Sequence, residues 1–269
     1  MIPIIRDLFR RFFRHRLLSQ SAQLAFYLLL SFFPCLIILT RFAVHETVLD
    51  TLLQILKGLL PSAASDLVQE NLSSLGSFPL LPTGIVVLFY AASRGVSTLI
   101  YASVTAYDAT ETRSFVFRFL LRFLLLPLIL LLGVTAIVGL LLLNSLLAHS
   151  AILYPLWQSL RYPVALLVAS ALLAVFYFFL PTKRVPLYRH LPGAIFSAVV
   201  GIAASFVFSA MADLNHLYSA YYGNMSGVIL LLLWLYLCSL IILLGIELNA
   251  VIFQKGDSRH EHNRSDAND

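Results

Sequence analysis

Apolar residues gather in six long segments of the chain, and short stretches rich in polar and charged residues separate them. A helix that spans a bilayer needs about 20 mostly apolar residues. The segments that meet this length are residues 22–44, residues 84–106, a stretch within 115–147, a stretch within 162–180, residues 191–212 and residues 226–253. The third segment is longer than a bilayer requires, so we expect that helix to tilt or to project. The pattern predicts an all-α fold, a polytopic integral membrane protein with six transmembrane helices.

Two shorter stretches have helical periodicity without the length to span a membrane. Residues 5–18 place apolar side chains on one face and arginines on the other, which predicts a helix lying in the membrane interface. Residues 47–76 repeat apolar residues at helical spacing until Pro61, after which Ser62 can cap a second short helix. We expect a helical hairpin on the outer face of the membrane. It either packs against the spans or forms a lid over a cavity.

Composition indicates that one membrane domain accounts for nearly the whole chain. Of the 269 residues, 60% are hydrophobic and only 12% are charged, whereas about 25% of residues in soluble domains are charged. We therefore expect three parts: a basic amphipathic segment at residues 1–21, the membrane domain at residues 22–254, and a polar tail at residues 255–269. The tail has too few apolar residues to pack, so we expect it to be disordered.

Basic residues alternate between the ends of the predicted spans. The N-terminal segment, the loops after the second and fourth spans, and the tail are rich in Lys and Arg, whereas the other three connections have few. Because basic loops remain in the cytoplasm, the pattern places both termini there and residues 47–76 outside. The net charge of +5 then reflects topology and contact with anionic headgroups. We expect the lipid bilayer as a partner and no nucleic acid.

An arginine within the second predicted span is the most informative candidate for a binding site. A charged residue at this depth faces the protein interior, a wet cavity or a partner, because lipid solvates it poorly. It belongs to a polar stripe at three- or four-residue spacing, formed by Tyr90, Arg94, Thr98, Tyr101 and Thr105. We expect the stripe to face inward and to be reachable from water. Arg94 then either binds an anion such as a phosphate or carboxylate, or forms a buried ion pair that fixes two helices.

The sixth predicted span adds Glu247 and Asn249 to the candidate polar site. Glu247 is a candidate partner for Arg94, although Arg94 lies near the middle of its span and Glu247 near the end. A Glu247 side chain that extends to the membrane interface is the alternative.

Small residues recur at every fourth position of the fifth predicted span. The row consists of Gly193, Ser197, Gly201, Ser205 and Ser209. Such a row lets two helix backbones approach closely, so we expect these residues to form a packing seam against another helix.

Motifs for catalysis and metal binding are absent from the sequence. It has no Gly-rich phosphate loop, no His-Glu-x-x-His and no paired-carboxylate cluster. Two tail histidines, His260 and His262, fall short of the three or four fixed ligands of a typical metal site. We therefore expect no catalytic residues, no metal and no cofactor.

Four sequence blocks resemble the YihY/virulence-factor-BrkB family of bacterial inner-membrane proteins. They are residues 22–39, 93–115, 191–201 and 221–252, and the last, YYGNMSGVILLLLWLYLCSLIILLGIELNAVI, is the most specific. The residues that carry the family pattern are Pro34, Arg94, Tyr222, Gly223, Trp234, Gly245, Glu247 and Asn249. Thr105 departs from it, since the family tends to have Asn before an Ala-Tyr pair. The resemblance implies a six-helix domain in the bacterial inner membrane with a role in the cell envelope.

Three functions follow as hypotheses. The leading one is a transporter or flippase-like protein for a lipid or an anionic envelope precursor, and a wet pocket that reaches Arg94 would favour it. A non-transporting scaffold or accessory factor for envelope biogenesis is the alternative, favoured by a closed interior. The ribonuclease label carried by some family members ranks third, because a ribonuclease needs a metal or an acid–base site. A cluster of acids or histidines at the cytoplasmic surface would favour that enzyme.

Overall fold

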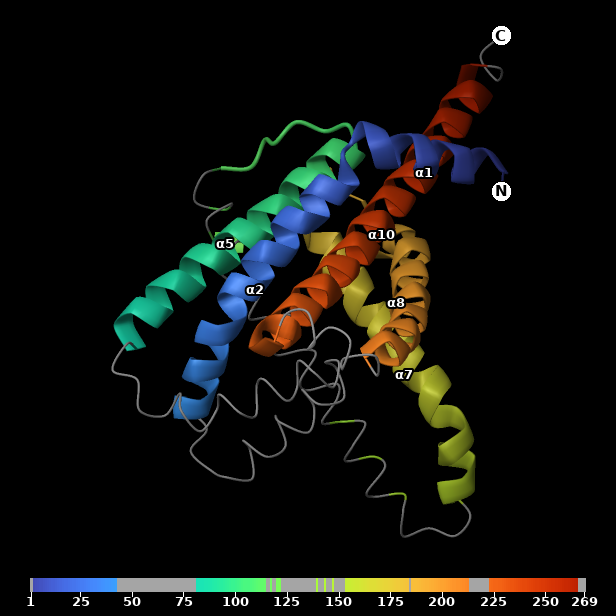
Figure 1. Cartoon of the computed structure of the whole chain (residues 1–269). Helices are drawn as coiled ribbons and strands as arrows, with labels where there is room; N and C mark the ends of the chain where they lie inside the picture. The colour runs from blue at the N-terminus through green and yellow to red at the C-terminus, as the bar shows by residue number, and fades with distance from the viewer. Residues whose placement is uncertain are drawn as a thin grey trace. The chain divides into compact units, whose positions relative to one another are not determined.

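The described part of the chain is built from helices. The computed structural model describes residues 2–42, 81–114, 117, 120–121, 139, 143, 147, 153–183, 185–212 and 223–265, and these contain no strand. The α-helices are α1 (Ile2–Arg14), α2 (Leu17–Phe42), α5 (Leu81–Ala106), α7 (Leu153–Phe179), α8 (Leu191–Ala212) and α10 (Ser226–Ser265) (Figure 1). Short 3-10 helices, Leu187–His190 and Gly223–Met225, precede α8 and α10.

Four of these helices contain stretches that are long and apolar enough to cross a membrane. The stretches are Gly84–Ala106, Tyr154–Phe179, Leu187–Phe208 and Ser226–Lys255, and α2 contributes a shorter apolar helix, Leu17–Phe32. The predicted all-α membrane architecture is confirmed at this level. The third predicted span, within residues 115–147, lies almost wholly outside the described residues, as does the predicted hairpin at 47–76. The count of six spans therefore stays a prediction.

Contacts divide the chain into two compact units. One comprises Met1–Leu18, Leu99–Val200 and Ile241–Asp269, and the other comprises Ser19–Thr98 and Gly201–Leu240. The second unit has an apolar cluster in which Phe208 of α8 packs against Leu230 and Trp234 of α10. The Phe208 and Trp234 ring centroids lie 5.1 Å apart. The first unit contains the polar contacts around Glu247, and the second contains Arg94 and its partner Tyr27.

The amphipathic N-terminal segment forms its own helix, α1, rather than the beginning of a span. The chain leaves α1 at Arg16, whose φ of 51° lies in the left-handed region that often ends a helix. α2 then starts at Leu17. Ile5, Phe9 and Phe13 are exposed along one side of α1, which is the arrangement expected of a helix in the membrane interface.

Two helices extend beyond the segments that hydropathy predicts. α10 continues to Ser265, so residues 255–265, expected to be disordered, are helical. Lys255 is the first residue of this polar extension, and its Nζ forms an ion pair with an Asp7 carboxylate oxygen at 2.6 Å. α7 begins at Leu153 rather than near residue 162. The added N-terminal turns include Trp157, which is buried. A hydropathy window centred on the most apolar residues of α7 does not include them.

α8 and α10 approach closely where Gly193 meets Gly245. A Cβ atom on Gly193 would lie only 2.6 Å from Asn249 Cγ and nearer still to the Gly245 carbonyl oxygen. The Gly193 N–H donates to Asn249 Oδ1 at 2.7 Å. This N–H lies in the first turn of α8, where no carbonyl of the same helix can accept it. Asn249 therefore caps α8 from a neighbouring helix, and the missing Cβ lets it do so.

Polar side chains continue this contact along the α10 backbone. The Ser197 hydroxyl donates to the Ile241 carbonyl, and the Tyr177 hydroxyl donates to the Ile242 carbonyl, both at 3.1 Å. The two hydroxyl oxygens lie 2.8 Å apart. A Cβ on Gly245 would collide with both hydroxyls. Gly245 thus leaves the space in which α7 and α8 bond to α10.

The remaining positions of the predicted seam have other surroundings. A Cβ on Gly201 would meet nothing within 4 Å. Ser205 is exposed and donates to the Gly201 carbonyl of its own helix at 2.9 Å. The side chain of Ser209 lies outside the described part. Close helix contact in this row is therefore observed at Gly193 and Ser197.

The two kinds of glycine predict opposite effects of one substitution. We expect Gly193→Ala and Gly245→Ala to lower the free energy of unfolding by about 1–3 kcal/mol, because the added methyl overpacks the α8–α10 contact. Gly201→Ala should be neutral or stabilising, since alanine favours a helix by about 1 kcal/mol and space is free. Unfolding of the three variants in detergent would measure this. Equal stability of all three would contradict the observed contact.

Candidate functional site

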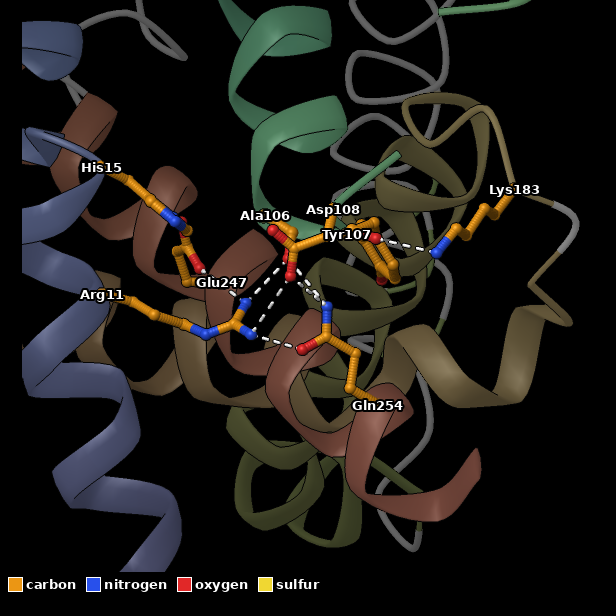
Figure 2. Close-up of polar contacts among 8 residues, drawn as sticks. All are labelled: Arg11, His15, Ala106, Tyr107, Asp108, Lys183, Glu247 and Gln254. Carbon is orange, nitrogen blue, oxygen red and sulfur yellow. Dashed lines mark hydrogen bonds and ion pairs between the residues drawn. The ribbon is translucent and has the colours of Figure 1, made fainter. Parts of the chain in front are cut away.

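A buried carboxylate on α10 is the centre of the most extensive polar network in the first unit. The Glu247 side chain is 2% exposed, and its Oε1 lies 2.5 Å from His15 Nδ1. Its Oε2 lies 3.6 Å from Arg11 Nη1 and has no hydrogen-bond partner. Figure 2 shows both basic side chains reaching toward it from α1 and the turn that follows. Because a buried charge is costly unless it is paired, these contacts fix α1 against α10.

Arg11 extends the network to a third helix. Its Nη1 donates to the carbonyl of Ala106, the last residue of α5, at 2.7 Å. Its Nη2 donates to Gln254 Oε1 and lies 3.7 Å from the Asp108 carboxylate, which is 61% exposed. Carbonyls at a helix C-terminus lack partners within the helix and interact favourably with a cation. One guanidinium therefore joins α1, α5 and α10 (Figure 2).

The loops after α5 and α7 meet at the same network. Lys183 Nζ donates to the Tyr107 carbonyl at 3.0 Å. Arg113 donates to the carbonyls of Phe179, at 3.3 Å, and Pro181. α1 and Lys255 contribute further contacts to this network. Members of all four basic regions, which are the N-terminal segment, the two loops and the tail, therefore take part in it. The N-terminal helix and the end of α10 are in direct contact through Asp7 and Lys255.

Tyr107 completes the buried part of the network. Its side chain is almost fully buried, and its hydroxyl lies 3.5 Å from His190 Nδ1. Burial raises the pKa of this phenol above its usual range, and the nearby Glu247 carboxylate raises it further. Tyr107 is therefore a neutral phenol at physiological pH. Its ring also packs against that of Phe253, with centroids 5.8 Å apart.

The described partner of Arg94 is Tyr27, not Glu247, the candidate partner that the sequence offered despite its different depth. Its Nε donates to the Tyr27 hydroxyl of α2 at 3.3 Å, and its guanidinium carbon lies 5.8 Å from the centroid of that ring. Within the described ranges no carboxylate pairs with Arg94. The candidate partner Glu247 instead pairs with Arg11 and His15.

The polar stripe of α5 divides between buried and exposed positions. Tyr90 and Tyr101 are 58% and 64% exposed, and Arg94 is also exposed. Thr98 is buried and donates to the Arg94 carbonyl at 3.1 Å, while Thr105 is half-buried. The stripe is therefore not a single inward face.

The sequence pattern does not predict Arg11 and His15 as the partners of Glu247. Arg11 and His15 stand one helical turn apart on the polar face of the N-terminal segment, but every arginine there was assigned to topology. One feature of the sequence could have indicated these partners: a carboxylate near the end of an apolar span requires a cation from a neighbouring segment. Asn249, a member of the candidate polar site, is buried and caps α8, a function that its spacing in the sequence does not indicate.

Comparison with known proteins identifies the family. The model of the family named virulence factor BrkB matches residues 8–269. The chain belongs to the BrkB family. The ribonuclease-like protein YfkH of Bacillus subtilis (strain 168) is 31% identical over 269 residues, covering 94% of this chain and 96% of YfkH.

Other relatives of this BrkB-family protein are named only as membrane proteins. The UPF0761 membrane protein VV0203 of Vibrio vulnificus (strain YJ016) is 28% identical over 264 residues, covering 94% of this chain and 83% of the relative. A UPF0761 membrane protein of Pseudomonas aeruginosa (strain LESB58) is 31% identical over 163 residues, covering 60% of this chain and 40% of the relative. No solved structure matches the chain at a significant level. The resemblance seen in the sequence blocks is confirmed, and no catalytic role is shown for the family.

Two carboxylates that share Arg11 offer a matched test of the network. We expect Glu247→Gln to lower the free energy of unfolding by about 3 kcal/mol, because it removes the buried counter-charge of Arg11. Asp108→Asn should lower it by less than about 1 kcal/mol, since that carboxylate is exposed. Reversible unfolding in mixed micelles would compare the two. Equal losses would show that burial of Glu247 contributes nothing.

Proposed function

We propose that this BrkB-family protein is a transporter or flippase-like protein of the bacterial inner membrane. Its proposed substrate is a lipid or another anionic precursor of the cell envelope. The observation that carries the proposal is an exposed cation, Arg94, in a helix apolar enough to span a membrane.

A guanidinium keeps its charge at any physiological pH. Within a bilayer it therefore requires water, a carboxylate or a bound anion. Among the described residues Arg94 bonds only to the neutral hydroxyl of Tyr27. Phosphate and carboxylate groups are the natural partners of such a guanidinium. The exposed phenol of Tyr90, one turn away on α5, adds a hydrogen-bond donor for the same anion.

The proposal includes an orientation with both termini in the cytoplasm. Direct contacts between α1 and the end of α10, such as that of Asp7 with Lys255, support placing the two termini on one side. The positive-inside rule supports the cytoplasm as that side, because the basic loops also gather there.

A scaffold or accessory factor for envelope biogenesis is the second candidate. The close α8–α10 contact at Gly193 and Gly245 favours it, because such packing leaves no passage between these two helices at that level. A ribonuclease has less support. His15 and Glu247 form the acid–histidine pair that such an enzyme would need near water, but their side chains are 7% and 2% exposed and contact each other.

Flux across proteoliposome membranes tests transport directly. We expect the protein to move fluorescent phosphatidylglycerol between leaflets, measured by quenching with dithionite, faster than empty liposomes do. Arg94→Gln should reduce the rate at least tenfold, and Arg94→Lys should retain part of it, because lysine keeps the charge but loses the planar fork.

Arg161→Gln is the matched control, because Arg161 of α7 also lies over a tyrosine ring, that of Tyr162, at 4.7 Å. This variant should transport normally. No flux above empty liposomes would refute transport, and full flux in Arg94→Gln would refute the role of Arg94.

A further inference from the structure

A hollow of about 340 Å³ lies between α1 and the end of α10, within the first unit. The lining residues whose side chains the structure describes are Asp7, Arg10, Arg11, Arg14, Val251, Gln254 and Lys255, and four of these seven are cationic and one is anionic. Binding sites for small molecules begin at about this volume. The surplus of positive charge selects an anionic occupant.

The cations of this hollow differ in whether they are already paired. Arg11 is engaged with Glu247, Gln254 and the Ala106 carbonyl. Lys255 pairs with Asp7, and its hydrogen bond holds the pKa of that carboxyl below the usual value.

Arg10 and Arg14 are exposed, and neither has a hydrogen bond or an ion pair with a residue whose side chain the structure describes, a set that ends at Lys255 on α10. They lie one turn apart on α1, where like charges repel. An oxyanion between them would relieve that repulsion and accept charge-assisted hydrogen bonds from both.

The apolar side of α1 indicates where this anion comes from. Ile5, Phe9 and Phe13 are 65%, 67% and 60% exposed and follow one another at four-residue spacing. Phe9 immediately precedes Arg10 and Phe13 immediately precedes Arg14, so the aromatic row and the arginine pair lie on adjacent strips of the helix. A helix with this composition lies in the membrane interface with its aromatic side among the lipids. The arginine pair is then at the depth of the lipid phosphates.

We propose that the hollow binds the phosphate of an anionic phospholipid, held between Arg10 and Arg14, with Val251 as an apolar wall. The inference rests on the proposed function for its substrate class, an anionic lipid, and it assigns that class a binding site on α1. Binding at equilibrium does not require transport, so the two claims fail separately.

Lipid-dependent thermal stability of the full-length protein in neutral detergent tests the site. Phosphatidylglycerol should raise the unfolding temperature, whereas phosphatidylcholine and inorganic phosphate at matched ionic strength should not. Arg10→Gln/Arg14→Gln should weaken the apparent affinity for phosphatidylglycerol at least tenfold. The control Arg6→Gln/Arg16→Gln removes the same charge from exposed arginines outside the hollow and should bind like the wild type.

Further variants keep the test decisive. Arg10→Lys/Arg14→Lys keeps both charges and should bind phosphatidylglycerol more tightly than the glutamine pair does. This variant provides a test of the site that does not depend on the folding of the glutamine pair. Arg94→Gln should keep the full response to phosphatidylglycerol while it loses flux. Equal losses in the two glutamine pairs would overturn the site, as would the absence of a response in the wild type. A response to inorganic phosphate that equals the response to the lipid would overturn the assignment to phospholipid.

Discussion

A buried negative charge on α10 is the constraint on which the described end of this molecule depends. Glu247 lies in the most apolar of the candidate spans, where an unpaired carboxylate would be costly. Its partners are the Arg11 guanidinium and the His15 ring, which belong to an N-terminal segment outside the predicted spans. A surface helix is therefore held to the membrane domain by electrostatics and hydrogen bonds, and the same arginine ties down the last carbonyl of α5.

Two nearby residues of α10 perform different structural tasks because a helix turns about 100° per residue. Glu247 and Asn249, two residues apart, point to roughly opposite sides. Glu247 contacts α1 through a buried ion pair, and Asn249 caps α8 beside Gly193. One turn of α10 thus connects its neighbours on both sides. Fixing α1 in this way also forms the hollow beside Arg10 and Arg14.

Hydrophobic periodicity predicts α1, α2, α5, α8 and the greater part of α7 and α10, because burying or solvating an apolar face depends on local spacing. It was not sufficient to predict which helices meet. Glu247 and His15 are separated by 232 positions, and nothing local to either residue indicates the other. Gly193 and Gly201 belong to the same row of small residues, yet only Gly193 meets a neighbouring backbone. Spacing of this kind permits close approach without specifying where it occurs.

The same limit explains the candidate ligand sites. Arg94 was recognised from its improbable position in an apolar span, which is local information, whereas its contact with Tyr27 depends on the packing of α2 beside α5. The arginines of α1 were read as topological signals, because the rule that basic residues remain in the cytoplasm already accounted for them. Only the contact of α1 with α10 distinguishes Arg11, which pairs with Glu247, from Arg10 and Arg14, which pair with none of the side chains that the structure describes.

Hydrogen–deuterium exchange of α1 tests most directly whether Glu247 holds this helix in place. The amides of residues 2–14 would be followed in the wild type, in Glu247→Gln and in Asp108→Asn, under conditions in which all three remain folded. Loss of the buried charge should speed exchange in α1 at least tenfold in Glu247→Gln, while Asp108→Asn exchanges like the wild type. Unchanged protection of α1 in Glu247→Gln would show that the helix is held by something other than this carboxylate.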